Sequence, residues 1–150
     1  MSWMNAPALR FSVRGQPVGK ARPRFSRTRV YTPAKTVFYE RQIGEAAKAA
    51  MFGFPPVAPD VAFDVEIEAY YAVPASWSKK RRLSALQGVD RPMTKPDLDN
   101  LAKAVLDGMN GIVFEDDKQV VCLSVTKHYS DTPRVEVVVR VAHPTEVAHG

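Results

Sequence analysis

Acidic residues gather between Asp97 and Asp117, in the part of the chain best suited to chemistry. This segment contains six Asp and Glu side chains and one base, Lys103, although the protein of 150 residues has a formal net charge of +5. Carboxylates at contact distance raise one another's pKa unless a cation separates them, and Mg²⁺ prefers such hard oxygen ligands. An acidic cluster in a basic protein is therefore a candidate metal site.

Residues 98–109 are expected to form the helix that carries this cluster. At 100° per residue, one stripe of the helix is apolar and faces the core; it consists of Leu98, Leu101, Ala102, Val105 and Met109. Along one polar flank, Asp99, Lys103 and Asp107 follow one another at intervals of four residues, within reach of each other. Asp97 follows a proline and suits the N-cap position, from which it can face Asp99.

Asp116 and Asp117 follow a short apolar run at 112–114, and periodicity does not tell whether they return to the start of the helix. If they return, three carboxylates converge on one point. A bound Mg²⁺ would lower the pKa of a water molecule and neutralise charge that develops on a phosphorus atom, while Lys103 could contact the scissile phosphate. The spacing leaves a second interpretation open, in which the helix flank is a solvated salt-bridge ladder and Asp97 is only an N-cap.

Basic residues concentrate in the first half of the chain. Through residue 82 there are fourteen Lys and Arg against six Asp and Glu, a net charge of +8, whereas the remainder carries −3. Residues 10–35 contain eight bases and no acid, and a glycine and a proline make the middle of this segment loop-like. Phe25 and Tyr31 lie among the bases, as in surfaces that contact phosphates and stack on exposed nucleobases. A solvated basic loop with both rings anchored in the core is the alternative.

Four strands are predicted from alternating or continuous apolar residues: 9–13, 61–73, 120–127 and 135–141. The last two are expected to pair as a hairpin around a turn at 131–133, and strand 61–73 to be of the antiparallel type with one solvated face. A helix over 33–51 is expected to have Thr32 as N-cap and Pro33 in its first position, and another helix should begin near Ser78.

Together these elements predict an α+β fold, a single domain over 1–150 with about four strands in a mixed sheet and helices packed on the sheet. Residues 1–8 and 143–150 are expected to be flexible tails. The one cysteine, Cys122, lies in an apolar run and is interpreted as a buried core residue, so neither a disulfide framework nor a Cys/His zinc pattern is expected. No leader or membrane-spanning run is evident, and a cytoplasmic location is expected.

The acidic segment resembles the sequence signature of a known protein family. The run Lys-Pro-Asp-Leu-Asp-Asn-Leu-Ala-Lys at 95–103, followed by Asp-Gly-Met-Asn-Gly at 107–111 and Asp-Asp-Lys-Gln at 116–119, resembles the signature of the RusA family of Holliday-junction resolvases. The segment 19–25 and the Tyr-Thr-Pro entry into a helix at 31–33 resemble the phage and prophage branch of that family. The likeness extends over most of the chain.

The resemblance implies a RusA-like fold and a Mg²⁺-dependent endodeoxyribonuclease, with Mn²⁺ as an alternative ion. It implies a homodimer that nicks two opposing strands of a four-way DNA junction. By position in the motif, Asp97, Asp99 and Asp117 match the metal-binding catalytic aspartates and Lys103 matches the catalytic lysine, while the role of Asp116 stays open.

One departure from the family pattern concerns DNA contacts. The dipeptide at 95–96 stands where the best-known member has a run of arginines, so the contacts are expected to have moved to the upstream bases, Lys20, Arg22, Arg24, Arg27 and Arg29. Two other functions are alternatives to a junction resolvase. One is a DNA-binding module that has lost catalysis, and the other is a metal-dependent flap or single-strand nuclease.

Overall fold

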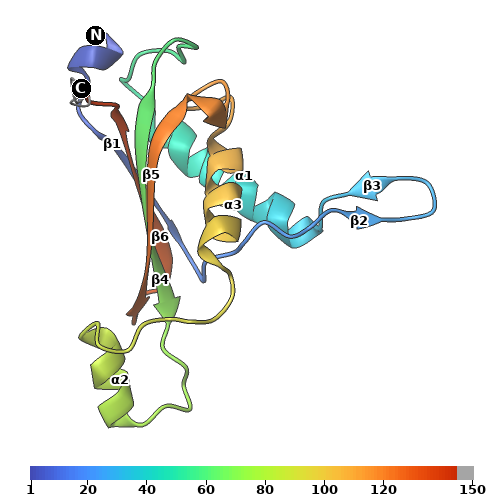
Figure 1. The fold of residues 1–150 in the computed structure, drawn as a ribbon, viewed down its shortest axis with the longest axis vertical. Coiled ribbons are helices and arrows are strands. Elements are labelled where there is room, and N and C mark those ends of the chain that lie inside the picture. Colours follow the sequence, from blue (N-terminus) through green and yellow to red (C-terminus); the bar gives the residue numbers. More distant parts are fainter. Residues whose placement is uncertain (145–150) are drawn as a thin grey trace, which may run out of the picture.

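Two helices cover one face of a four-stranded sheet, and a small hairpin projects away from them (Figure 1). This computed structural model describes residues 1–144. The elements are η1 (Trp3–Asn5), β1 (Leu9–Arg14), β2 (Arg24–Phe25), β3 (Val30–Tyr31), α1 (Ala34–Ala50), β4 (Phe63–Ala72), α2 (Lys79–Leu86), α3 (Leu98–Met109), η2 (Asp117–Gln119), β5 (Val120–Ser130) and β6 (Arg134–Val141). The predicted α+β fold with a mixed sheet is confirmed.

Strand β4 is one of the two inner strands of the sheet, and alternate residues along it are buried. Phe63, Val65, Ile67, Ala69 and Tyr71 are each at most 2% exposed, whereas the residues between them are partly exposed. This alternation is the one that the sequence predicts. The buried face joins the core against α1 and α3, which Figure 1 shows side by side on that face.

The order of the strands corrects one prediction. The sheet runs β1-β6-β4-β5, so β5 and β6 are not hydrogen-bonded to each other and do not form the expected hairpin. Strand β4 lies between them, antiparallel to β6 and parallel to β5. Strands are about 4.8 Å apart, and the steps from Ser130 to Arg134 can reach roughly 13 Å, so this short connection is long enough to pass over one strand.

The edge position of β5 corrects a second prediction. The sequence predicts Cys122 in the core, but it is exposed. Its neighbours Val121 and Leu123 are 63% and 41% exposed. A strand at the end of a sheet has a neighbour on one side only, and therefore an apolar run does not by itself imply burial.

Three smaller differences concern the ends of elements. Residues 1–8, expected to be a flexible tail, are tied to the body: Trp3 is 6% exposed and its indole Nε1 donates to the Pro56 carbonyl oxygen at 2.8 Å. Helix α1 has Pro33, not Thr32, at its N-cap. Leu98 is 45% exposed, because the first turn of α3 extends past the core. Of the other predicted tail, residues 145–150 lie outside the described part of the chain.

Helices α1 and α3 approach each other closely where glycines face the partner helix. A Cβ atom built on Gly108 of α3 would lie 2.7 Å from the Ile43 Cβ and 2.9 Å from the Glu40 carbonyl oxygen, both on α1. Such contacts are shorter than packed atoms tolerate. The glycine therefore sets a short distance between the helices, and this distance brings the polar flank of α3 within reach of α1.

Candidate active site

Asp97 lies at the start of α3, in the N-cap position that the sequence predicts. Its side chain makes no capping hydrogen bond, so the carboxylate is not occupied with the helix end. The preceding residue is held from the sheet, since the Tyr71 hydroxyl on β4 donates to the Pro96 carbonyl oxygen at 2.8 Å. Burial, and secondly the charge of Asp97, raises the pKa of Tyr71 to about 12. Tyr71, which sequence reasoning treated only as a core residue, therefore positions the start of the site.

Asp97 and Asp99 open into one cavity of about 860 Å³. Its walls come from the start of α3, the loop that leads into β2 and the first turn of α1. The cations in these walls are Lys20, Arg22, Arg24, Lys35 and Lys95. Two carboxylates therefore share a concave surface with several bases. This arrangement can attract a phosphate diester and place a metal ion beside it.

The loop before β2 is docked on the start of α3. The backbone N–H of Lys20 donates to the Asn100 carbonyl oxygen at 2.9 Å. Only glycine fits at position 19, because a Cβ atom there would lie 2.6 Å from the Pro96 Cβ. The glycine in the predicted loop thus has a specific purpose: it lets the basic segment touch the residue that precedes Asp97.

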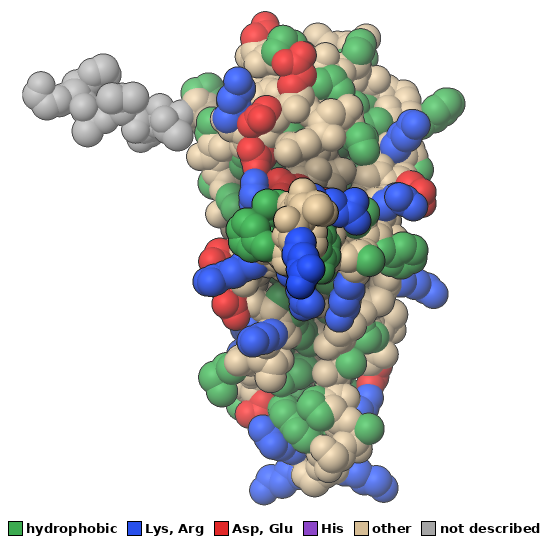
Figure 2. Space-filling model, turned by 90° about the vertical axis from the view of Figure 1, so that its right-hand side faces the viewer, with side chains coloured by type: hydrophobic (Ala, Val, Ile, Leu, Met, Phe, Trp, Pro, Cys, Tyr) green, Lys and Arg blue, Asp and Glu red, His purple; other side chains and the backbone are tan. Residues whose placement is uncertain are grey.

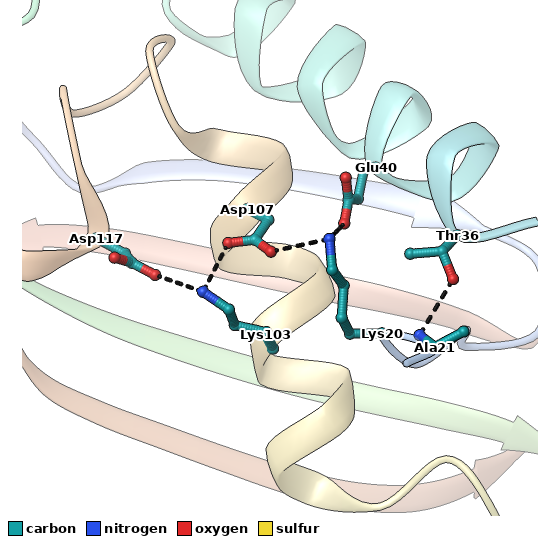
Figure 3. A network of polar contacts seen from close by, with 7 residues as sticks. All are labelled: Lys20, Ala21, Thr36, Glu40, Lys103, Asp107 and Asp117. Atoms are coloured by element: carbon teal, nitrogen blue, oxygen red, sulfur yellow. Dashed lines mark hydrogen bonds and ion pairs between the residues drawn. The ribbon is translucent and has the colours of Figure 1, made fainter. Parts of the chain in front are cut away.

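On the next turns of α3, an alternating chain of charges joins four segments: η2, α3, the loop before β2 and α1 (Figure 3). Lys103 Nζ lies 3.0 Å from Asp107 Oδ1 and 3.4 Å from Asp117 Oδ2. On its other side, Asp107 accepts from Lys20, whose Nζ also lies 2.6 Å from Glu40 Oε1. The salt-bridge ladder weighed from the spacing is therefore present at positions 103 and 107, and Asp117 is joined to it.

The same contacts explain the shifted pKa values of both lysines. For Lys103, hydrogen bonding to Asp107 raises the pKa above its usual value, and Asp117 adds to the effect. For Lys20, burial lowers the pKa, but hydrogen bonds to Glu40 and Asp107 outweigh burial and the net shift is upward. Both lysines are therefore cationic at neutral pH. Lys20, predicted as a DNA contact, is paired with two carboxylates, and its side chain is 24% exposed.

Asp117 is positioned by the short helix η2, whose ends are fixed on both sides. Asp116 accepts from the backbone N–H of Lys118 at 2.8 Å, and this hydrogen bond lowers the pKa of Asp116. Gln119 is 7% exposed and donates to the Ala58 and Val61 carbonyl oxygens at 2.7 and 2.9 Å. The Asp-Asp-x-Gln motif thus has a structural explanation: its outer residues anchor the segment, and the second aspartate projects toward α3.

The question left open by the sequence, whether Asp117 returns to the start of the helix, has a partial answer. Asp117 returns to α3 and meets Lys103, one turn beyond Asp99. Within residues 1–144, no three Asp, Glu, His or Cys side chains lie close enough together to hold a metal ion as they stand. The donors nevertheless suit Mg²⁺ or Mn²⁺ chemically, since they are carboxylates and two of them face one cavity.

The other predicted DNA contacts lie on the projecting hairpin. Arg22, Arg24, Arg27 and Arg29 are all exposed, and none of them pairs with an acid anywhere in the described range 1–144. Figure 2 looks at the molecule from the side on which this hairpin points outward, and Lys and Arg side chains surround it there. These cations are free to meet a polyanion.

Sequence comparison adds evidence of a different kind. The family model described as endodeoxyribonuclease RusA matches residues 14–140. A relative in Bacillus subtilis (strain 168), described as uncharacterized protein YqaN, is 38% identical over 136 residues, which cover 88% of this chain and 95% of that protein. The matched range includes the cavity, α3 and η2. Among the described residues, none of the helices has the length and apolar character needed to cross a membrane.

Proposed function

The chain belongs to the RusA family of endodeoxyribonucleases, and on this premise we propose that it cuts four-way DNA junctions in a reaction that depends on Mg²⁺ or Mn²⁺. One observation carries the proposal: Asp97 and Asp99 line a cavity that is also lined by Arg22 and Arg24, where the hairpin begins. Acids in the middle of a phosphate-binding surface weaken DNA binding unless a metal ion lies between them and the phosphate. Their presence therefore favours catalysis over binding alone.

The proposed metal ligands are Asp97, Asp99 and Asp117. When bound, the ion supplies a water molecule with a lowered pKa and stabilises charge on the phosphorus. Asp97 and Asp99 are exposed and face the cavity, so both are available to it. Asp117 is engaged with Lys103, and its carboxylate becomes available when that ion pair opens. Because Gln119 anchors η2, Asp117 stays near α3 whether its ion pair with Lys103 is closed or open.

Lys103 is proposed to stabilise the negative charge of the scissile phosphate. Its side chain is 54% exposed, and it retains Asp107 as a partner if Asp117 leaves it. The shared carboxylate of Asp107 also fixes Lys20, so the cationic group at position 103 is oriented by a network and not by a single contact. A preoriented cation near a reacting phosphate is a usual source of transition-state stabilisation.

We further propose that the enzyme acts as a homodimer on the two strands of the junction. Two nicks on opposing strands require two active sites, and a two-fold dimer provides them in symmetric positions. Sedimentation equilibrium of the purified protein tests this part. A species with twice the mass of 16.6 kDa is expected, and a monomer at concentrations that support paired nicking would contradict it.

The activity is tested on three DNA substrates of related sequence: a four-way junction, a flap and a plain duplex, each with and without Mg²⁺. Paired nicks in the junction alone, lost on chelation, are the expected result. Preferred cutting of the flap would favour the flap or single-strand nuclease, and binding of the junction without any cutting would favour the inactive module.

The same assay tests the carboxylates. Asp99→Asn should abolish cutting and leave junction binding intact or tighter, because a negative charge has been removed from the DNA-binding surface. Asp90→Asn is the matched control, since it removes the same charge in the loop after α2. Full activity of Asp99→Asn in Mg²⁺ would overturn the assignment of the site.

A further inference from the structure

The projecting hairpin, residues 22–31, has a defined shape in spite of its short strands. Arg24 pairs with Tyr31 and Phe25 with Val30, and the turn between them is closed by Ser26 and Arg29. The Ser26 N–H donates to the Arg29 carbonyl oxygen at 2.8 Å, and the Arg29 N–H donates to the Ser26 hydroxyl at 3.2 Å. Figure 1 shows the hairpin extending away from α1 and the sheet. The turn therefore holds the side chains of β2 and β3 in place at a distance from the body.

The two faces of this hairpin differ. Residues directly opposite each other in an antiparallel pair lie on the same face. Phe25 and Val30 therefore share one face, where they are 81% and 56% exposed, and Arg24 and Tyr31 share the other. A two-stranded hairpin is at best marginally stable in water by itself. An apolar face at the end of such an arm indicates a surface that a partner covers.

Charge indicates which partner this is. No acid occurs between residues 10 and 39, and the exposed arginines of the hairpin have no carboxylate partner within the described residues. A second copy of this chain is the poorer match, because it carries a net charge of +5 like the first. A nucleic acid instead offers phosphates for the arginines and flat apolar bases for Phe25.

Position indicates which part of the nucleic acid is contacted. The base of the hairpin, at Arg22 and Arg24, lines the same cavity as Asp97 and Asp99. DNA whose phosphate reaches those carboxylates therefore passes beside the hairpin. In a continuous duplex, bases are stacked on both sides and must be separated before a ring can enter. At a branch point, the terminal base pairs of each arm lack one continuous neighbour, and a ring can stack there at a lower cost.

We propose that Phe25 stacks on a base at the branch point, with Val30 beside it and the hairpin arginines on the flanking phosphates. Phe25 then determines the preference for branched over linear DNA, whereas the arginines contribute affinity for both. The inference rests on the proposed function insofar as DNA is the ligand, but it requires no cleavage. It also assigns separate roles to the aromatic and basic residues of one hairpin.

The test uses binding without catalysis. The Asp99→Asn protein, without divalent metal, is titrated into a four-way junction that carries 2-aminopurine beside the branch point, and into a linear duplex of matched length. The fluorescence of this base reports stacking. Phe25→Ala should remove the fluorescence change and reduce the preference for the junction about tenfold, in keeping with the loss of one base–aromatic contact. Phe25→Trp should retain both.

Phe52→Ala is the matched control. Phe52 is 93% exposed but follows the far end of α1, roughly 25 Å along the helix from the hairpin. Its loss should change neither signal. Arg27→Gln should weaken binding to junction and duplex alike and flatten the salt dependence of both. Since Phe25 contributes nothing to the core, its alanine variant should have the circular dichroism spectrum of the parent.

Two outcomes would overturn the inference. One is an unchanged preference and fluorescence signal in Phe25→Ala. The other is a dimer that dissociates in Phe25→Ala while the DNA preference stays the same, because the apolar face would then contact a second copy. Failure of the proposed function is distinct: a protein that never cuts, but whose junction signal depends on Phe25, refutes the resolvase and supports the stacking role.

Discussion

Lys103 Nζ lies 3.4 Å from Asp117 Oδ2, which joins the middle of helix α3 to a residue fourteen positions further along the chain. The ammonium is thereby held on the side of α3 that also carries Asp99, one helical turn earlier. A cation fixed in this way, one turn from Asp99, suits the phosphate-stabilising role proposed for Lys103. Exposed ion pairs of this kind contribute little to folding.

Replacing Lys103 by Met tests this interpretation. If Lys103 stabilises the transition state, the variant should lose about 100-fold or more in cleavage rate, while its affinity for the junction falls only a few-fold. Lys118→Met removes an exposed cation from η2, the adjacent segment, and should retain most of the activity. The measurement is a single-turnover assay with saturating enzyme, which separates the cleavage rate from DNA affinity. Equal losses of rate in the two variants would mean that only the local positive charge matters.

Asp107 was not selected as a site residue from the sequence, yet it accepts from both Lys103 and Lys20. We expect Asp107→Asn to destabilise the fold by about 1 kcal/mol, chiefly through Lys20, whose side chain is less exposed than that of Lys103. Both lysine pKa values are raised in the folded protein. The stabilisation is therefore fully present below the unfolded lysine value of 10.5 and is lost as the pH rises through the folded values.

The measurement is urea unfolding at pH 7 and at pH 11. The difference between Asp107→Asn and the parent should be largest at pH 7 and should shrink at the higher pH. Asp107→Glu, which keeps the charge, should recover part of the stability and of the cleavage rate. A difference that is constant with pH would exclude the ion pairs as its cause.

Several elements of the site follow from local sequence alone. Helix α3 runs from Leu98 to Met109, as predicted, because a capping residue after a proline, an apolar stripe and a glycine beyond the end all agree. Local agreement of this kind makes element boundaries readable. The contact of Lys103 with Asp107 likewise follows from helical geometry, since both residues lie on one helix.

Relationships between distant segments could not be predicted in the same way. Nothing in β5 or β6 indicates that β4 lies between them, because strand order depends on the packing of the whole sheet. The exposure of Cys122 follows from that order. The contact of Lys20 with Glu40 depends on the close approach of three segments, and the sequence presents Lys20 only as one base among many. The role of Gln119 could have been suspected from its place in the motif, but its partners could not.

Tyr71 provides a test of how the sheet positions Asp97. Tyr71→Phe removes the hydrogen bond to the Pro96 carbonyl oxygen and should cost about 1 kcal/mol of stability, since the ring itself stays buried. Cleavage should fall about tenfold if the start of α3 loosens by a fraction of an ångström. Junction affinity should stay unchanged, because Tyr71 is only 1% exposed and its hydroxyl is therefore out of reach of DNA.

The pH dependence of the same variant adds an independent readout. The pKa of Tyr71 is raised from 10.0 to about 12 in the folded state, so the unfolded chain loses this proton first as the pH rises. The free energy of unfolding therefore decreases between these values, and the decrease should be shallower in Tyr71→Phe. Identical pH profiles for the two proteins would show that the hydroxyl titrates normally and is not buried against the site.

Gly19 tests the docking of the basic loop on α3. In Gly19→Ala, the new Cβ would lie 2.6 Å from the Pro96 Cβ and 3.2 Å from the Asn100 Cβ, so the loop must move away from the helix start. Because the displaced loop loses the hydrogen bond from the Lys20 N–H to Asn100, stability should fall by about 1 kcal/mol or more. The cavity lined by Asp97, Asp99 and the hairpin arginines should be distorted. Cleavage should therefore fall about tenfold, with little change in affinity for linear duplex. Retained cleavage in a variant with an unchanged unfolding curve would mean that the loop adapts, and that the position of the hairpin relative to Asp97 does not limit the reaction.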